Sequence, residues 1–250
     1  MIDIHSHILP EVDDGARSME ESLEMVEEAK KCNFSTIIST CHYIKRTYEI
    51  TEELRKKKIE ELNNKISGIQ IQIGSEIYAD PDILKFLQEK KASTINNTRY
   101  VLFEIPFHNN IAFFNKMIDD LKRNGYLPII AHPERYEIVK ENPKIVEDWK
   151  KRGIYIQCNY ESVLGKYGKQ ARNIFKILLK HELIDFLGSD VHRVGGYLRV
   201  QKAIANIKKI VDEKYFLIIT EKNQQKVLKN EKIELEEKNE IKQTIFGRYR

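Results

Sequence analysis

The sequence lacks the features of membrane-spanning and secreted proteins. Its longest apolar runs, such as those at 101–103 and 215–219, are far shorter than the roughly 18 residues needed to cross a bilayer. Its first residues contain no basic segment followed by an apolar one, so we expect no secretory signal. Only three cysteines are present, and their number and spacing are typical of reduced thiols: Cys32, Cys41 and Cys158. We therefore expect a soluble, cytoplasmic protein without direct membrane insertion.

An excess of charge of one sign is also missing, and glycine and proline are scarce. The 42 lysines and arginines against 38 aspartates and glutamates leave a net charge of +4 over 250 residues. Proteins that bind nucleic acid normally carry a basic stripe, so we expect no nucleic-acid partner. A hydrophobic fraction of 41% with 11 glycines and 6 prolines is typical of a globular chain. We predict one domain over residues 1–230, followed by a charged peripheral tail over residues 231–250.

Short β-rich runs alternate with longer stretches at helical spacing, which is the pattern of an α/β fold. Ser18 and Glu21 form a capping box that predicts the start of the first helix. Periodicity alone fits both an open doubly wound sheet and a closed parallel barrel, and in both the active site lies at the carboxyl ends of the strands. The seven predicted strands are 2–5, 36–40, 69–74, 100–105, 127–131, 154–158 and 184–188.

Histidines and carboxylates gather at the ends of these strands. In an extended segment His5 and His7 point to the same side, so both imidazoles can reach one ion, and Asp190 and His192 repeat this spacing. The nine candidate metal ligands are His5, His7, Asp14, His42, Glu76, Glu104, His132, Asp190 and His192. The alternative, a network of buried polar residues that only satisfies strand-end backbone groups, explains few of these coincidences.

The composition of this set indicates the kind of metal. Imidazoles and carboxylates without thiolates favour Mn²⁺, Zn²⁺ or Fe²⁺. Nine ligands are too many for one ion, but with bridging carboxylates they suit two or three ions, as in two-metal phosphoryl displacement.

The motifs that carry these residues resemble, in the same order, those of the PHP superfamily. The closest resemblance is to the bacterial manganese-dependent tyrosine-protein phosphatases of capsule and exopolysaccharide operons, through the opening at 5–10, the Asp-Asp-Gly at 13–15 and the His-Pro-Glu-Arg-Tyr run at 132–136. The motifs are Asp3-Ile4-His5-Ser6-His7, Val12-Asp13-Asp14-Gly15, Thr40-Cys41-His42-Tyr43, Gly74-Ser75-Glu76, Ala131-His132-Pro133-Glu134-Arg135-Tyr136 and Gly188-Ser189-Asp190-Val191-His192.

This resemblance implies a distorted (β/α)₇ barrel of the PHP, TIM-like type, with a three-metal site at the C-terminal ends of its strands. The nine candidate ligands all have counterparts in the family motifs, and the implied cofactor is two or three Mn²⁺ ions, with Fe²⁺ or Zn²⁺ as alternatives. Two positions depart from the family pattern. Cys41 stands where proline is common, and Tyr197 stands where an arginine is frequent, with Arg193 and Arg199 on either side.

The predicted mechanism is attack on the phosphorus by a metal-bridging hydroxide, because metal coordination lowers the pKa of water. Arg135 is the expected phosphate clamp, since a guanidinium can bind two phosphoryl oxygens at once. We also predict catalytic roles for Asp14, His42 and Arg199. A cysteine-dependent tyrosine phosphatase is excluded, because it needs an arginine six residues after its cysteine; those positions here hold Ile38, Thr47 and Leu164.

The implied substrate is phosphotyrosine in a protein, expected to be the tyrosine-rich tail of a membrane-associated bacterial tyrosine autokinase that regulates capsular and exopolysaccharide synthesis. Two alternatives stay open. One is another PHP phosphoesterase, a histidinol-phosphate phosphatase or a phosphodiesterase. The other is a metal-loaded regulator that binds a kinase without catalysis. Oligomerisation is also left open.

Overall fold

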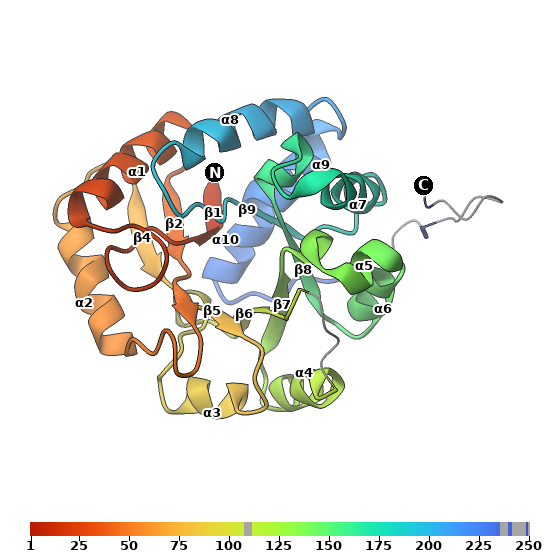
Figure 1. Cartoon of the computed structure of the whole chain (residues 1–250), viewed down its shortest axis with the longest axis horizontal. Helices are drawn as coiled ribbons and strands as arrows, with labels where there is room; N and C mark the ends of the chain where they lie inside the picture. Colours follow the sequence, from red (N-terminus) through yellow and green to blue (C-terminus); the bar gives the residue numbers. More distant parts are fainter. Residues whose placement is uncertain (108–111, 236–239, 242–248, 250) are drawn as a thin grey trace.

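The computed structural model describes residues 1–107, 112–235, 240, 241 and 249, and its strands form two parallel sheets (Figure 1). The three-stranded sheet has the order β1 (Ile2–Ser6), β2 (Thr36–Ser39), β4 (Gln70–Ile73). The six-stranded sheet has the order β3 (His42–Tyr43), β5 (Glu76–Tyr78), β6 (Tyr100–Glu104), β7 (Leu127–Ala131), β8 (Tyr155–Asn159), β9 (Phe186–Gly188). The α/β class and the seven predicted strands are confirmed, with strand ends within two residues of the predicted ones.

Two short strands, β3 and β5, were not predicted. The chain passes from β2 to β3, and from β4 to β5, across two residues each time, and thereby moves from the first sheet to the second. The backbone N–H of Glu76 donates to the carbonyl of Thr40 at 3.0 Å at this crossing. On the other side, the N–H of Asp190 donates to the carbonyl of His5 at 2.8 Å, and that of His7 to Val191 at 3.0 Å. Backbone hydrogen bonds therefore link the two sheets at two places.

Helices follow most of the strands and cover the sheets. The capping prediction for the first helix is confirmed in part: the Ser18 side chain accepts from the N–H of Glu21 at 3.2 Å, but the Glu21 carboxylate accepts from Arg17 at 2.7 Å rather than from Ser18. Within the part of the chain that the structure describes, no helix combines the length and the apolar surface needed to cross a bilayer. The helices are α1 (Met19–Lys31), α2 (Glu52–Asn63), α3 (Ile83–Gln88), α4 (Phe114–Arg123), α5 (Glu137–Glu141), α6 (Ile145–Lys151), α7 (Gly168–Lys180), α8 (Gly196–Ile207), α9 (Glu213–Leu217) and α10 (Asn223–Leu228), with shorter helical segments η1 (Ile95–Asn97), η2 (Pro133–Arg135), η3 (Tyr160–Leu164) and η4 (Ile218–Lys222).

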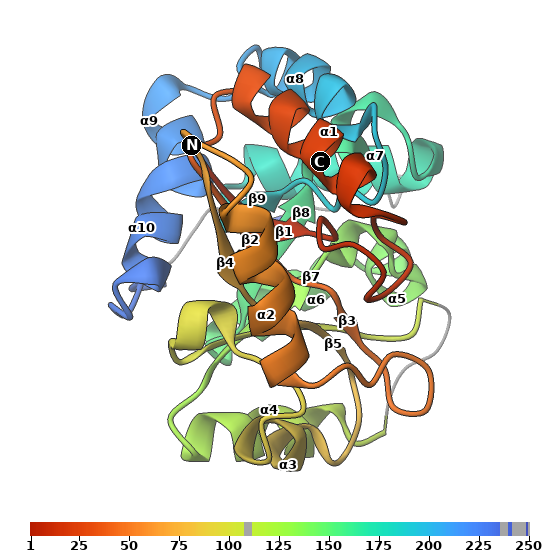
Figure 2. The ribbon, with the colours of Figure 1, turned by 90° about the vertical axis from the view of Figure 1, so that its left-hand side faces the viewer.

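The apolar core has two parts. The larger one lies between the helices and the strands. The smaller one joins side chains from both sheets, among them Ile4 and Ile38 from the first sheet and Leu102 and Ile129 from the second, and Val227 of α10 packs onto it. Figure 2 shows α9 and α10 at the end of the molecule where β1 begins, opposite the loop that follows β1. One end of the strands is thus closed by apolar packing, which leaves the carboxyl ends for polar residues.

Most of the predicted tail, 231–250, lies outside the described residues. Its first residues contact the sheet: Tyr100 donates from its hydroxyl to the carbonyl of Glu231 at 2.7 Å, and Tyr155 donates to the carbonyl of Ile233 at 2.6 Å. Ile233 is buried. These contacts hold the chain against the end of the strands that α10 also covers.

Candidate metal centre

The nine candidate ligands come from the carboxyl ends of strands in both sheets and meet in one place. Three groups of them each present ligand atoms within 4.8 Å of one another. His132, which follows β7, contacts the second and third groups through Nε2, 2.7 Å from Glu76 Oε1. The groups are His7, Asp14, His42 and His192; His5, His7, Glu76 and Asp190; and His42, Glu76 and Glu104.

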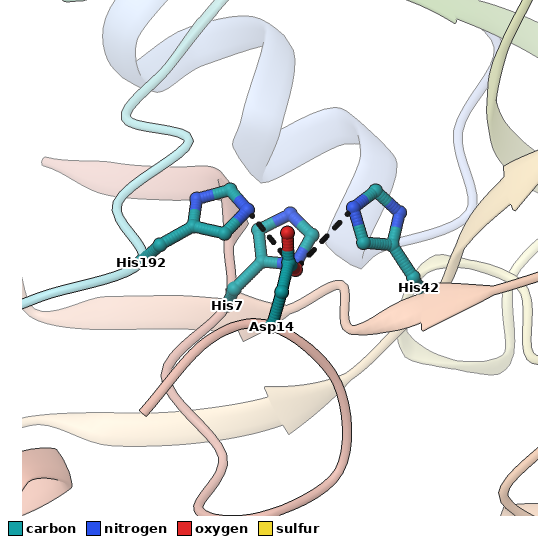
Figure 3. Close-up of side chains that lie close together, drawn as sticks. All are labelled: His7, Asp14, His42 and His192. Atoms are coloured by element: carbon teal, nitrogen blue, oxygen red, sulfur yellow. Dashed lines mark ion pairs between the residues drawn. The ribbon is translucent and has the colours of Figure 1, made fainter. Parts of the chain in front are cut away.

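Asp14 lies between two histidines at the open side of the site (Figure 3). Its Oδ1 atom is 3.4 Å from His192 Nε2 and 3.6 Å from His42 Nε2. The ring of His7 stacks on that of His192 with 3.9 Å between centroids. Half of the Asp14 side chain is exposed, whereas His7 is fully buried. This group therefore faces the solvent, and the other two lie deeper.

Glu76 occupies the centre of the deeper part. Its Oε2 atom is buried and has no hydrogen-bond partner. Three imidazole nitrogens surround this oxygen: His5 Nε2 at 3.2 Å, His7 Nε2 at 3.3 Å and His42 Nδ1 at 3.3 Å. A buried carboxylate oxygen without a partner is costly, and one cation shared with the imidazoles would satisfy it.

The partners of His5 and His7 indicate which ring nitrogens are protonated. His5 Nδ1 lies 2.8 Å from the amide oxygen of Gln157, and His7 Nδ1 lies 2.7 Å from Asp13 Oδ2, so both Nδ1 atoms act as donors. When both rings are neutral, the two Nε2 atoms carry lone pairs, and they face each other at 3.2 Å. Such a pair needs a proton or a metal ion beside it, and despite burial the carboxylates around the two rings raise the pKa of His5 and of His7, which favours positive charge at this place. Histidines that bind a metal through one ring nitrogen commonly donate the N–H of the other to an acceptor outside the site, as the Nδ1 atoms of His5 and His7 do here. The donor set therefore fits divalent metal ions.

Burial and neighbouring charges shift the pKa values of the candidate ligands in different directions. Burial opposes the charged form of Glu76, but the imidazoles of His5 and His42 hold its pKa well below the ordinary value. Burial, reinforced by the charges of Glu76 and Asp190, raises the pKa of Glu104 well above its ordinary value. Burial lowers the pKa of His132 to about 4, and the nearby guanidinium of Arg135 contributes to this shift. His132 is thus neutral at pH 7, as a metal ligand must be. The raised pKa of Glu104 shows that burial beside the carboxylates of Glu76 and Asp190 disfavours its charged form.

Two of the candidate ligands have a strained backbone. His132 has φ = 34° and Asp190 has φ = 51°, both in the left-handed region. This conformation costs an ordinary residue about 1–2 kcal/mol. Strain of this kind concentrates at functional sites, where the surrounding structure maintains it. His132 directly follows β7 and Asp190 lies two residues after the end of β9, and each side chain contacts other candidate ligands.

A pocket of about 480 Å³ opens above the candidate ligands and is lined by several cations. The guanidinium of Arg135 donates from Nη1 to Asp190 Oδ2 at 3.0 Å and lies between two aromatic rings, 4.5 Å from the centroid of Phe107 and 4.4 Å from that of Tyr167. Arg199 also lines the pocket, and its Nε donates to Glu161 at 3.2 Å. Arg193 and Lys166 line it as well, and Lys166 was not predicted.

Sequence reasoning missed the residues that hold the ligands in place. The strand β8 carries no histidine or carboxylate, yet its amides connect two ligands: Gln157 contacts His5, and Asn159 Nδ2 donates to Asp190 Oδ2 at 2.7 Å. Gln157 Nε2 also donates to Asn159 Oδ1 at 2.9 Å. Polar side chains two apart on a buried strand were the available signal, because they share one face. Asp13 has a similar role, since its Oδ2 accepts from both His7 and the N–H of His42.

The three cysteines are buried and free. Burial raises the pKa of Cys32 to about 11 and that of Cys41 to about 12, and it raises the pKa of Cys158 well above the ordinary value. The thiolate is the nucleophilic form of cysteine, so none of these side chains is poised for attack at neutral pH.

Comparison with known proteins gives a consistent picture. The family model for capsular polysaccharide synthesis, CpsB/CapC, matches residues 1–229. The tyrosine-protein phosphatase YwqE of Bacillus subtilis (strain 168) is 31% identical over 253 residues, which cover 99% of each chain. The tyrosine-protein phosphatase CpsB of Streptococcus pneumoniae is 32% identical over 203 residues, 78% of this chain and 84% of that protein.

Solved structures extend the comparison to the fold. One structure comes from a crystallographic study of YwqE from Bacillus subtilis and CpsB from Streptococcus pneumoniae, which are named there as metal-dependent tyrosine phosphatases. The chain superposes on it with a TM-score of 0.89 and 30% identity, over 97% of this chain and all of the other. A lactonase of Listeria monocytogenes, Lmo2620, shares the fold at a TM-score of 0.60 and 14% identity, covering 92% of this chain and 95% of that one.

Proposed function

Since this chain belongs to the CpsB/CapC family of capsular polysaccharide synthesis, we propose that it is a metal-dependent protein-tyrosine phosphatase. The observation that supports this most is the arrangement of Glu76, whose unpartnered oxygen lies among three imidazole nitrogens at the base of a cation-lined pocket. None of the three cysteines is poised as a nucleophile, so this proposal assigns activation of the nucleophile to metal ions.

The residues that would hold the ions are the nine candidate ligands, in the three groups described above. Mn²⁺ is the ion we propose, with Fe²⁺ or Zn²⁺ compatible with the same nitrogen and oxygen donors. When bound, two or three such ions would supply positive charge to the phosphoryl oxygens and lower the pKa of water, the metal chemistry used in phosphoryl displacement.

The chain's own side chains supply the rest of the substrate site. Arg135 would bind the phosphoryl group through the guanidinium nitrogens that Asp190 does not use, and Arg199 would add a second guanidinium at the wall. Asp14 and His42 lie at the open side, where they would contact both the ions and the substrate. The phenol released from phosphotyrosine has a pKa of about 10, so its departure needs less help from a general acid than that of an alkoxide.

We also propose that the two linked sheets form a distorted (β/α)₇ barrel. In this description β2 with β3, and β4 with β5, are single barrel strands that are each interrupted by two residues. The hydrogen bonds at Glu76 on one side and at Asp190 on the other support this description.

For the substrate, we propose a phosphotyrosyl protein of polysaccharide synthesis, with the tyrosine-rich tail of a membrane-associated tyrosine kinase as the first candidate. Such a tail lies at the inner face of the membrane, so this proposal assigns the enzyme to the cytoplasm. The support is the family's association with capsule synthesis and the tyrosine-phosphatase names of the relatives.

The test is to strip the protein with a chelator, reload it with Mn²⁺ and measure hydrolysis of p-nitrophenyl phosphate, a phosphotyrosyl peptide and histidinol phosphate, with the metal content counted in the same samples. We expect cleavage of the peptide to return with two or three metals per chain. Preferential cleavage of histidinol phosphate would instead indicate a small-molecule phosphatase. Metal binding without any turnover, together with binding of a kinase tail, would indicate the regulatory alternative.

A further inference from the structure

The wall of the pocket continues into a surface that is basic and partly apolar. We define this basic face as residues 160–172, which span η3 and the start of α7, together with residues 192–202, which span the loop before α8 and its first half. Both views place α7 and α8 in the upper part of the molecule (Figures 1 and 2). An ion pair joins the two segments, because Arg199 Nε donates to Glu161 at 3.2 Å.

The charge of the basic face is far from that of the whole chain. Glu161 is its only acidic residue, and the side chain of Glu161 is 1% exposed, so no carboxylate of these two segments reaches the solvent. Glu161 also accepts from Lys166 Nζ at 2.9 Å, and so it is shared between two cations. The cations of the face are Lys166, Lys169, Arg172, Arg193, Arg199 and Lys202. A protein with a net charge of +4 thus concentrates six positive charges beside one pocket.

The basic face also exposes large apolar side chains. Leu164, Val194 and Leu198 are 37%, 39% and 44% exposed, and the only other large apolar residue so exposed in the described part of the chain is Leu54 of α2. Leu198 and Lys202 are one helical turn apart and share a side of α8. Clustered exposed apolar residues mark interaction sites, whereas scattered ones need no explanation.

The border of the face and its connection to the pocket define its extent. On the α1 side, where the carboxylate of Glu28 accepts from the N–H of Gly195 at 2.7 Å, α1 exposes the carboxylates of Glu24 and Glu27, so the basic face ends there. On the other side, Lys166, Arg193 and Arg199 line the pocket itself. A peptide whose phosphotyrosine enters the pocket would therefore extend across this face.

We propose that the basic face is the docking surface for the peptide that flanks the phosphotyrosine, and that it selects peptides with acidic residues and an apolar residue near the phosphotyrosine. This inference rests on the proposed phosphatase function and adds the substrate class. Charge complementarity raises the rate of encounter and disfavours partners with basic flanks. The apolar side chains supply the contact area that charge alone does not.

The test uses the full-length metal-loaded enzyme and three substrates: a phosphotyrosyl peptide with Asp, Glu and Leu flanks, a matched peptide with Ser and Gly flanks, and p-nitrophenyl phosphate. We expect kcat/KM for the acidic peptide to exceed that for the neutral one by about tenfold at low salt, and the difference to shrink at 1 M salt, where the screening length falls to about 3 Å. The triple variant K169E/R172E/K202E, whose positions lie outside the pocket lining, should lose this preference and keep its activity on p-nitrophenyl phosphate.

A matched control reverses charges far from the face. The variant K57E/K65E changes exposed lysines on and after α2 and should leave the peptide preference unchanged. Equal kcat/KM values for the two peptides in the wild type would overturn the docking proposal while leaving the phosphatase function intact. Absence of turnover on all three substrates would instead contradict the phosphatase function. Co-sedimentation with vesicles of anionic lipid that the triple variant abolishes, without any peptide preference, would assign the face to a membrane and overturn the peptide proposal.

Discussion

At the scale of single residues, the substrate side of the site depends on how Arg135 is held. Its guanidinium is held by a hydrogen bond to Asp190 and by contacts with the rings of Phe107 and Tyr167. The Tyr167 hydroxyl lies 3.1 Å from Asn159 Nδ2, so the ring itself is tied to β8. A guanidinium held in this way loses little freedom when it binds phosphate, because its plane is already set.

Replacing Arg135 should therefore weaken substrate binding while the nine candidate ligands still hold metal, although Asp190 loses the hydrogen bond that Arg135 donates. For Arg135→Ala we expect kcat/KM to fall by about 10- to 100-fold, the equivalent of a charged hydrogen bond of about 1.5–3 kcal/mol. Arg135→Lys keeps the charge but not the planar fork and should recover only part of the activity. Steady-state kinetics with p-nitrophenyl phosphate measures kcat/KM of the two variants, and the metal content is counted in the same samples. Wild-type kinetics in Arg135→Ala would show that another group binds the phosphate.

The second residue-scale prediction concerns the amide of Gln157. Replacing it with leucine removes the acceptor for His5 Nδ1, so the ring can change its tautomer and orientation. Loss of such an outer partner typically weakens metal binding by about 10- to 100-fold. Titration of the metal-free variant with Mn²⁺ by calorimetry measures the affinity directly. Gln72→Leu is the matched control, because Gln72 lies in β4 away from the candidate ligands. Equal Mn²⁺ affinities for Gln157→Leu and the wild type would mean that β8 does not orient His5.

The cysteines give a third prediction at this scale. Because all three are buried thiols with raised pKa values, the triple serine variant should retain most of its Mn²⁺-dependent activity. Each serine replaces a buried sulfur with a smaller and more polar hydroxyl, so the thermal midpoint should fall even though turnover persists, and least at Cys32, whose Sγ already donates to the carbonyl of Tyr197 at 3.0 Å. Circular dichroism checks the fold beside the phosphatase assay. Loss of turnover in a well-folded variant would contradict a mechanism without cysteine.

At the scale of elements, the sequence predicted the strands better than their pairing. Alternating and buried apolar runs mark where a strand lies, and all seven predicted strands are present. The passages from β2 to β3 and from β4 to β5 were not predictable, because a change of pairing partner leaves no trace in side-chain periodicity. The candidate ligands could be found because histidine and acidic side chains are unusual at buried strand ends. The amides of Gln157 and Asn159 left a weaker signal, two polar side chains on one face of a buried strand, which does not by itself indicate a ligand or its partner.

The start of α1 allows a prediction for one element. Ser18 caps this helix, which follows the loop that carries Asp14. Ser18→Ala should lower the free energy of unfolding by about 1 kcal/mol, the usual cost of losing a side-chain cap. Urea denaturation of the metal-loaded protein measures the change. Thr51→Ala, at the cap of α2, is a comparison in which a similar loss should occur without any effect on the Asp14 loop. No change in unfolding free energy for Ser18→Ala would mean that water replaces the cap at no cost.

At the scale of the whole molecule, the distribution of charge matters more than its sum. Carboxylates gather at the base of the pocket and cations along its rim, although the chain is nearly neutral overall. Glu76, Glu104 and Asp190 are all buried within this one site. Despite burial, the imidazoles hold the pKa values of Glu76 and Asp190 below the ordinary range, whereas burial and these two neighbouring charges raise the pKa of Glu104. The folded chain therefore has a region that is destabilised until positive charge enters it.

This imbalance predicts that metal removal lowers stability as well as activity. Ions that bind only the folded state stabilise it by about 2.7 kcal/mol at a free concentration of 100 times Kd, which for a chain of this size raises the thermal midpoint by about 5–10 °C. Scanning calorimetry of chelated and Mn²⁺-reloaded protein measures the shift, and His5→Ala is the control in which the shift should shrink. The thermal midpoint could instead be the same with and without Mn²⁺ in samples whose metal content differs as intended. That result would mean that the chain already compensates the buried carboxylates, and the proposed metal centre would lose its main physical support.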